Sequence, residues 1–171
     1  ERIERAHLTR FMRFVRERHH APVPDYPSLH RWSVEYPENF WSAVWDFCEV
    51  RAEQRATQII ENSNRMPGAK WFIDARFNYA ENLLRRNDEG PAIVFRNEGG
   101  ARRELSWREL HREVARIADG LKEAGVVAGD RVAGYLPNVP ETVIAMLATT
   151  SLGAVWSSCS PDFGASGVLD R

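Results

Sequence analysis

The sequence predicts an α/β fold with two parts: an N-terminal helical extension over residues 1–85, followed over residues 86–171 by the start of a layered parallel β-α-β-α-β domain. Three observations support this prediction. Helical periodicity dominates the first fifty residues, a break rich in turn residues occupies 87–91, and short apolar strands alternate with helical patterns from Leu105 onward. Such alternation is typical of parallel strands joined by right-handed crossovers.

The extension opens with a basic amphipathic helix. Its apolar stripe, spaced at i, i+3, i+4 and i+7, consists of Leu8, Phe11, Met12 and Val15. Four arginines face the other way: Arg10, Arg13, Arg16 and Arg18. A helix of this kind can lie on a membrane or enter a partner's groove, but we expect it to pack on its own domain. His19 and His20 lie at the C-terminal end of this helix, where positive charge is favourable for the helix dipole, and we expect them to be solvated.

The residues after this helix are predicted to be extended, because Pro22, Pro24 and Pro27 disfavour a helix. A second helix is expected to begin near Pro37. One wide apolar face of that helix is formed by Phe40, Trp41, Val44, Trp45 and Cys48. We expect this face to be core or interface, with an aromatic ligand cage as the alternative.

Turn residues at 62–64 and 67–68 predict a loop, after which Asn78 and Glu81 have the spacing of a capping box. A strand at 92–95, a turn at 97–100 and a returning strand that ends at Leu105 come next. Ser106 and Glu109 form a second capping box, and that helix is expected to stop at Gly125.

The remaining elements complete the alternation. We expect a strand at 132–136, a helix that starts around 137–140, a strand that begins at 154–156 and a polar loop over 157–162. The chain starts at Glu1 inside a helical pattern and stops at Arg171 where another helix has barely begun. We therefore expect it to be a segment of a longer protein, whose remaining residues cover the parallel sheet.

Composition excludes several classes of function. A net charge of −1 argues against general electrostatic binding of nucleic acid. No apolar run approaches the roughly 18 residues of a membrane helix, and no secretory leader opens the chain, so we expect a cytoplasmic protein. Cys48 and Cys159 stand far apart in the sequence. We expect two buried thiols rather than a metal site.

Common catalytic motifs are missing. The sequence contains no GxxxxGK[ST], no GxGxxG between a strand and a helix, and no GxSxG. None of the five histidines has an evident nucleophile partner, and we expect His111 to lie on the surface. The best candidate for an anion site is the stretch 157–162, because open α/β sheets bind ligands at the carboxyl ends of their strands. An ordinary strand-to-helix connection is the alternative.

Several segments, in order, resemble the adenylate-forming enzymes, and in particular their acetyl-CoA and acetoacetyl-CoA synthetases. The segment 71–84 (WFIDARFNYAENLL) is similar to their junction between N-terminal extension and main domain. The later segments are LSWREL at 105–110, GDRV at 129–132, LPNVPE at 136–141, and AMLA with GAV at 145–155. The resemblance covers essentially the whole chain. It implies an incomplete N-terminal domain of an adenylate-forming synthetase, with residues 86–171 as the first part of its AMP-binding domain.

Within this family, SPDFG at 160–164 resembles the acetoacetyl-CoA branch, whereas acetyl-CoA enzymes usually carry Gly-Gly-Phe there. The resemblance implies an acid–thiol ligase that uses ATP, Mg²⁺ and CoA as well as acetoacetate, with the rest of its own chain as a further partner. It also implies that Pro161, Asp162 and Phe163 contact the nucleotide of CoA, although the glycines are missing.

No catalytic residue and no metal ligand can be transferred to this chain. The family's phosphate-binding loop ends in Pro-Lys, and its other reactive motifs include an aromatic-Thr-Glu motif and a C-terminal lysine. None occurs in residues 1–171, and the only lysines, Lys70 and Lys122, lie outside such motifs. We therefore expect this segment alone to be inactive. The alternatives are another short-chain acyl-CoA synthetase, of acetyl or propionyl type, or a non-catalytic interaction module.

Overall fold

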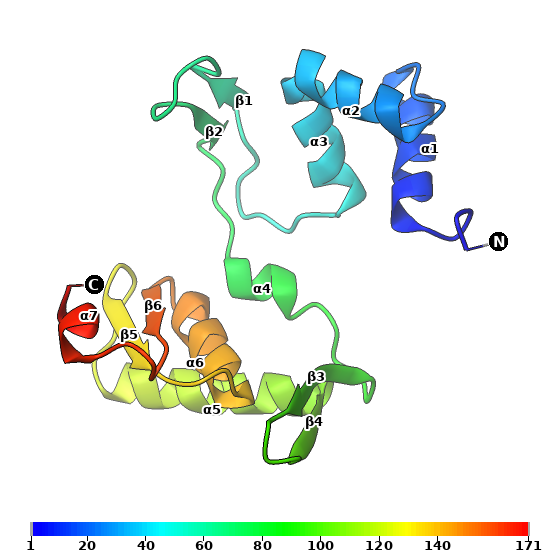
Figure 1. Cartoon of the computed structure of the whole chain (residues 1–171). Helices are drawn as coiled ribbons and strands as arrows, with labels where there is room; N and C mark the ends of the chain where they lie inside the picture. The colour runs from blue at the N-terminus through cyan, green and yellow to red at the C-terminus, as the bar shows by residue number, and fades with distance from the viewer. Residues whose placement is uncertain (1, 171) are drawn as a thin grey trace. The chain divides into compact units, whose positions relative to one another are not determined.

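The computed structural model describes residues 2–170, and the chain divides into two compact units, Glu1–Phe77 and Asn78–Arg171 (Figure 1). Each unit has a hydrophobic core made from its own residues. The predicted α/β class is confirmed. This division follows spatial contacts, so the two predicted domains, 1–85 and 86–171, stay a prediction.

Three helices form the core of the first unit. They are α1 (His7–His19), α2 (Tyr26–Glu35) and α3 (Pro37–Phe47). The predicted stripe of α1 is confirmed in its centre, because Phe11 and Val15 are buried, whereas Leu8 remains exposed. Val23, Leu29 and other apolar side chains complete this core. Burial of such side chains is the main favourable contribution to folding.

The prediction of an extended segment up to Pro27 is wrong. The structure begins α2 at Tyr26, and Pro27 lies in its first turn, where a proline loses no helical hydrogen bond. The N-cap is Asp25, whose carboxylate accepts hydrogen bonds from the Ser28 amide (2.9 Å) and hydroxyl (2.5 Å). Both bonds hold the pKa of Asp25 below its ordinary value, and the bond from the Ser28 hydroxyl is the larger cause.

An antiparallel hairpin that the sequence did not reveal follows α3. Strand β1 (Gln58–Glu61) pairs with β2 (Lys70–Ile73) across the predicted loop. Its two strands are short, and only Ile60 is buried in them. A short strand with so little apolar alternation gives a weak sequence signal.

The second unit begins with α4 (Tyr79–Leu83), followed by β3 (Pro91–Arg96), β4 (Arg102–Ser106) and the long helix α5 (Trp107–Glu123). The predicted capping box is confirmed at the start of α5. Glu109 accepts from the Ser106 amide at 2.8 Å, and Ser106 Oγ accepts from the Glu109 amide at 3.2 Å. A left-handed Gly125 (φ 89°) follows the end of the helix, as expected.

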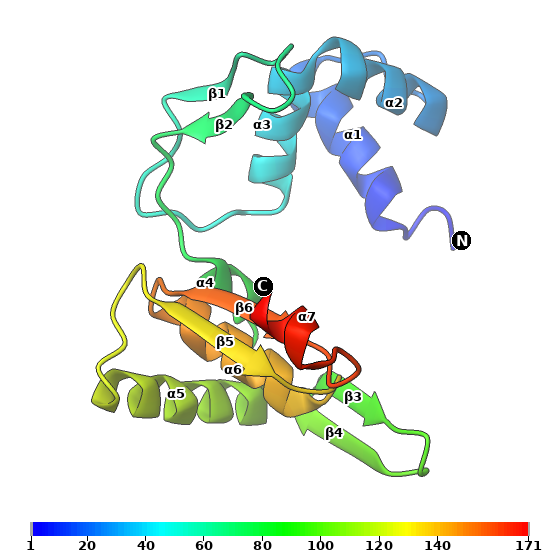
Figure 2. The ribbon, with the colours of Figure 1, turned by 60° about the vertical axis from the view of Figure 1, so that its left-hand side comes forward.

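One part of the predicted parallel arrangement is wrong. Strand β4 pairs antiparallel with β3 in a separate hairpin and does not join the later strands. Parallel pairing occurs between β5 (Arg131–Tyr135) and β6 (Val155–Cys159), which are connected through α6 (Pro140–Ser151). Helix α7 (Ala165–Leu169) follows β6. Figure 2 shows α6 behind the parallel pair and α5 beneath it.

The helices of this unit are joined by a polar side chain as well as by apolar packing. The Asn78 amide nitrogen donates to the Thr150 and Ser151 carbonyls at 3.0 and 3.1 Å, while its oxygen accepts from the Glu81 amide at 3.1 Å. Asn78 therefore caps the start of α4 and satisfies the last carbonyls of α6.

Two predictions about single residues are corrected. Cys48 is exposed, whereas Cys159 is buried as expected. His111 is half-buried, and its Nε2 atom is enclosed without a hydrogen-bond partner, so it is not a simple surface residue. Within residues 2–170, no helix combines the length and the apolar character needed to cross a membrane.

Candidate functional site

The candidate site lies at the carboxyl edge of the parallel pair. The last residues of the two strands, Tyr135 and Cys159, are partners in the register, so both strands end at the same edge. The segments 136–139 and 160–164 leave the sheet here. Open α/β sheets bind their ligands outside the carboxyl ends of their strands.

Pro161, Asp162 and Phe163 lie in one exposed turn between β6 and α7. The Phe163 amide donates to the Ser160 carbonyl at 3.0 Å, and the Ser160 hydroxyl donates to the Asp162 carboxylate at 2.8 Å. The Phe163 ring is 37% exposed. It leans against Gly167, where an added Cβ would come within 3.2 Å of the ring. The turn thus presents a carboxylate and an aromatic ring near the edge of the sheet.

The predicted polar loop over 157–162 is shorter than expected. Ser157 and Ser158 belong to β6, where successive side chains point to opposite faces, so their hydroxyls do not gather in a loop. The nearest carboxylate, Asp162, adds negative charge rather than the positive charge that a phosphate needs. These observations do not favour an anion site within this stretch.

Two residues that sequence reasoning missed shape this edge. The Tyr135 hydroxyl lies 2.8 Å from the Pro161 carbonyl oxygen and 3.0 Å from that of Phe163. Gly134 leaves room for the Trp156 ring, since an added Cβ would come within 2.6 Å of it. A sequence signal exists for Tyr135: as the last exposed residue of an alternating strand, it marks the carboxyl edge.

Helix α6, which follows the segment 136–139, forms an ion pair with β4. Glu141, in the first turn of α6, accepts a hydrogen bond from Arg103 of β4 at 2.6 Å. This bond is the main reason that the pKa of Glu141 lies below its ordinary value. Both side chains are about half exposed, so the pair contributes little to stability. It links the β3–β4 hairpin to the first turn of α6.

Both lysines form ion pairs within their own units. Lys70 on β2 pairs with Glu61 at 3.3 Å, and Lys122 near the end of α5 pairs with Asp119 at 3.3 Å. Across residues 2–170, the side chains of His, Cys, Asp and Glu form no group of three that could hold a metal ion.

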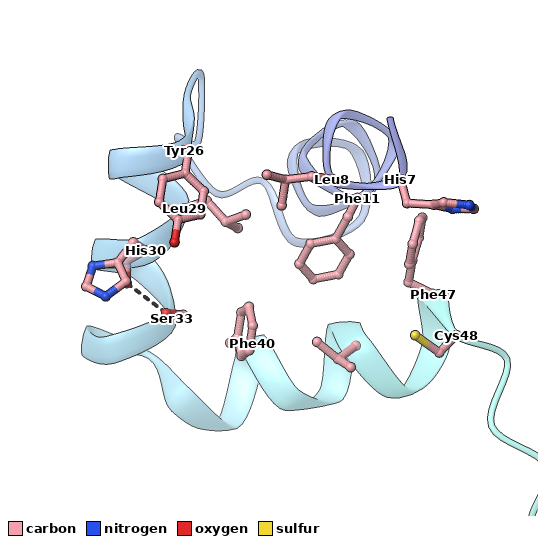
Figure 3. Close-up of a pocket in the computed structure, with 11 residues that line it drawn as sticks. His7, Leu8, Phe11, Tyr26, Leu29, His30, Ser33, Phe40, Phe47 and Cys48 are labelled. Carbon is pink, nitrogen blue, oxygen red and sulfur yellow. Dashed lines mark hydrogen bonds between the residues drawn. The ribbon is translucent and has the colours of Figure 1, made fainter. Parts of the chain in front are cut away.

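A concave feature lies in the first unit (Figure 3). It is a cavity of about 380 Å³ between α1, α2 and α3. Its apolar lining includes Phe11, Leu29, Phe40 and Phe47. The Phe11 ring stands edge-on to Phe40 and Phe47, with centroids 5.9 and 5.1 Å apart. Figure 3 shows the rings of His7 and His30 at opposite margins.

The predicted apolar face of α3 is divided between two neighbourhoods. Phe40, Val44 and Cys48 line this cavity, whereas Trp45 packs on Phe72 with ring centroids 4.9 Å apart. Trp41 remains 38% exposed and stands edge-on to Trp71. The face is thus partly core and partly the wall of the cavity between the three helices.

Comparison with known proteins places this geometry in a family. Residues 80–170 match the family model described as AMP-binding enzyme, and residues 26–83 match that of the acetyl-coenzyme A synthetase N-terminus. The chain is 46% identical to acetoacetyl-coenzyme A synthetase of Rhizobium meliloti (strain 1021), over 100% of the chain and 26% of that relative. It is 36% identical to malonamoyl-CoA synthetase of Penicillium aethiopicum, over 94% of the chain and 23% of the relative.

A solved structure agrees closely. Acetoacetyl-CoA synthetase from Streptomyces lividans superposes with a TM-score of 0.91 at 46% identity, covering 99% of this chain and 27% of that one. The chain thus spans about a quarter of the length of the relatives it matches. These matches confirm the resemblance drawn from the ordered sequence segments. The chain belongs to the AMP-binding enzyme family, and an N-terminal region of the acetyl-coenzyme A synthetase type precedes its AMP-binding part.

Proposed function

We propose that the chain is the N-terminal part of an AMP-forming acid–CoA ligase that joins acetoacetate to CoA with the use of ATP. The main support is the match to acetoacetyl-CoA synthetase from Streptomyces lividans, which covers 99% of the chain with a TM-score of 0.91. The SPDFG segment at 160–164, typical of that branch, lies in the exposed turn at the carboxyl edge.

The proposed reaction has two steps. A carboxylate oxygen of acetoacetate attacks the α-phosphorus of ATP, the bond to pyrophosphate breaks, and acetoacetyl-adenylate forms. The thiol sulfur of CoA then attacks the acyl carbon, and the bond to AMP breaks. Mg²⁺ would offset the negative charge that develops in the first step.

The role proposed for this chain is contact with CoA. The turn with Pro161, Asp162 and Phe163 lies where α/β sheets accept ligands. The Asp162 carboxylate can accept hydrogen bonds from a ribose hydroxyl or an adenine amino group, and the partly exposed Phe163 ring offers an apolar surface to a base. We further propose a cytoplasmic location for the ligase, in keeping with its polar substrates; fractionation of cells tests it.

The decisive experiment uses the full-length protein that contains this chain. Acid-dependent exchange of pyrophosphate into ATP reports the first step, and mass spectrometry of the CoA ester reports the second. We expect acetoacetate to give the highest kcat/KM among acetoacetate, acetate and propionate. A preference for acetate or propionate would assign the chain to the other short-chain synthetases, and no exchange with any acid would support a non-catalytic module.

A second candidate substrate follows from one relative. The malonamoyl and acetoacetyl groups both carry a carbonyl group at the position β to the carboxylate that is activated. Since the relative named for malonamoyl-CoA shares 36% identity with this chain, malonamate belongs in the same substrate panel. Higher kcat/KM with malonamate than with acetoacetate would replace the acetoacetate assignment and leave the ligase assignment intact.

The CoA contact has its own test in the same protein. Asp162→Ala removes the carboxylate that Ser160 now holds. We expect the KM for CoA to rise about fivefold, the size of one lost hydrogen bond, while pyrophosphate exchange is retained. An unchanged KM for CoA would remove Asp162 from the site. Glu98→Ala, in the exposed β3–β4 turn, is the matched control.

A further inference from the structure

A tyrosine at the end of β5 is hydrogen-bonded to the turn that carries the candidate CoA contact. The Tyr135 hydroxyl oxygen lies 2.8 Å from the Pro161 carbonyl oxygen and 3.0 Å from the Phe163 carbonyl oxygen. A phenol has a single hydroxyl proton, so it donates to one carbonyl at a time or shares the proton between them. In either case the two carbonyls are drawn toward the same atom.

The position of Tyr135 explains why it reaches this turn. It is the last residue of β5 and the register partner of Cys159, the last residue of β6. The β6 chain then turns back, and Figure 2 shows α7 and the segment before it next to the carboxyl end of β5. The Leu136 amide also donates to the Cys159 carbonyl, at 3.2 Å. The turn is thus anchored to β5 on both sides of Pro161.

Local bonds also support the turn. The Ser160 hydroxyl donates to the Asp162 carboxylate, and the Phe163 amide donates to the Ser160 carbonyl. Both of these bonds link residues at most three positions apart, and they define the shape of the turn without fixing it to the sheet. The bond from Tyr135 differs from these, because it spans 26 positions in the chain to reach Pro161.

We propose that Tyr135 is a positioning residue that holds the turn 160–164 in its CoA-binding shape before CoA arrives. The inference rests on the proposed function of that turn. A turn that is already ordered loses less conformational entropy on binding, so its ligand binds more tightly. Tyr135 acts through the carbonyls of Pro161 and Phe163, and its own contact with substrate is not required.

The test compares Tyr135→Phe with the wild type in the full-length protein. We expect the KM for CoA to rise about fivefold, as for the loss of one hydrogen bond, with kcat at saturating CoA and acid-dependent pyrophosphate exchange retained. We also expect backbone amides of 160–164 to exchange hydrogen faster, with unchanged exchange in β5 and β6. The matched control is Tyr36→Phe, a tyrosine of the first unit whose exposed fraction, 54%, equals that of Tyr135.

The outcomes separate this inference from the proposed function. If the wild type shows no acid-dependent exchange, the ligase assignment fails, and the hydrogen-exchange comparison still tests the anchoring. If the wild type is active but the variant has an unchanged KM for CoA or unchanged amide exchange at 160–164, the role of Tyr135 is overturned. Equal losses in both half-reactions would also overturn it, because they would indicate a general structural role.

Discussion

Thr149 is a fully buried polar residue in the core of the second unit. Its side chain is 0% exposed, and its hydroxyl has no hydrogen-bond partner in the structure. Its neighbour Thr150 differs in this respect, because its hydroxyl donates to the Met146 carbonyl at 2.8 Å. Thr149 therefore carries a buried hydroxyl without a hydrogen bond, whereas the hydroxyl of Thr150 is satisfied. Substitutions at these two adjacent positions of α6 allow the two situations to be compared directly.

Replacement of Thr149 by valine should stabilise the protein. Valine has nearly the same shape and removes a hydroxyl that is desolvated without compensation, so we expect a gain of about 1 kcal/mol in the free energy of unfolding. Urea denaturation measures the change. Thr150→Val is the control, and we expect it to lower the stability. A loss of stability in Thr149→Val would show that the hydroxyl has a partner after all.

At the scale of single elements, Asn78 joins two helices with one amide group. Its oxygen caps α4, and its nitrogen donates to two carbonyls at the end of α6. The sequence predicts the first role, because Asn is a preferred N-cap residue. The second role depends on Thr150 and Ser151, which are 72 and 73 positions away in the chain.

Asn78→Asp tests this second role. Aspartate retains the cap oxygen but loses both donors and places negative charge at the negative end of α6. We expect a loss of about 2 kcal/mol in unfolding free energy, from two hydrogen bonds of about 1 kcal/mol each. Thermal and urea denaturation provide the measurement. Asn64→Asp, in the exposed β1–β2 turn, adds the same charge and should have little effect. Equal stability of Asn78→Asp and wild type would contradict the link between helices.

The capping box of α5 should make stability depend on pH. The amide and the hydroxyl of Ser106 both donate hydrogen bonds to the Glu109 carboxylate. These bonds, of which the amide's is the larger cause, lower the pKa of Glu109 in the folded state. A carboxyl group whose pKa is lowered by folding stabilises the fold at pH values above its unfolded-state pKa of about 4.3. This stabilisation is lost as the pH falls through the folded-state pKa. Glu109→Gln retains a capping side chain without the charge.

We therefore expect the difference in Tm between wild type and Glu109→Gln to be largest near neutral pH and to shrink as pH falls below about 4. Thermal scans across this range measure it. Glu98→Gln, an exposed glutamate in the β3–β4 turn, is the reference for general charge effects. A difference that does not change with pH would mean that the charge of Glu109 is irrelevant to the cap.

At the scale of the whole molecule, the chain has two separate cores. The core of the first unit includes Val15 and Trp32, and that of the second includes Leu110 and Val114. Four tryptophans lie in the first unit and two in the second, at 107 and 156. Stability in proteins is often organised in such local cooperative units.

A core substitution should therefore act mainly on its own unit. We expect Val114→Ala to lower the stability of the second unit by about 1–3 kcal/mol and to leave hydrogen exchange in α1–α3 unchanged. Val15→Ala should give the converse pattern. Exchange followed by mass spectrometry distinguishes the two units directly. Faster exchange in both units after either substitution would show that they unfold as one.

The sequence by itself determined the elements whose signals are local. Spacing of Phe11 and Val15 predicted α1, Ser106 with Glu109 predicted the start of α5, and turn residues predicted the β3–β4 hairpin. These signals depend on neighbours within a few residues, which the sequence displays directly. The ordered segments also predicted the family, which the comparisons confirmed.

Only the tertiary structure decided that β1 pairs with β2, that β4 stays outside the parallel pair, how α3 divides its apolar face, and which residues support the turn 160–164. The bonds of Tyr135 and Asn78 join positions far apart in the chain, and no local pattern specifies such a partner. The physical reason is that hydrogen bonds and apolar contacts depend on distance in space, whereas propensity and capping depend on distance along the chain.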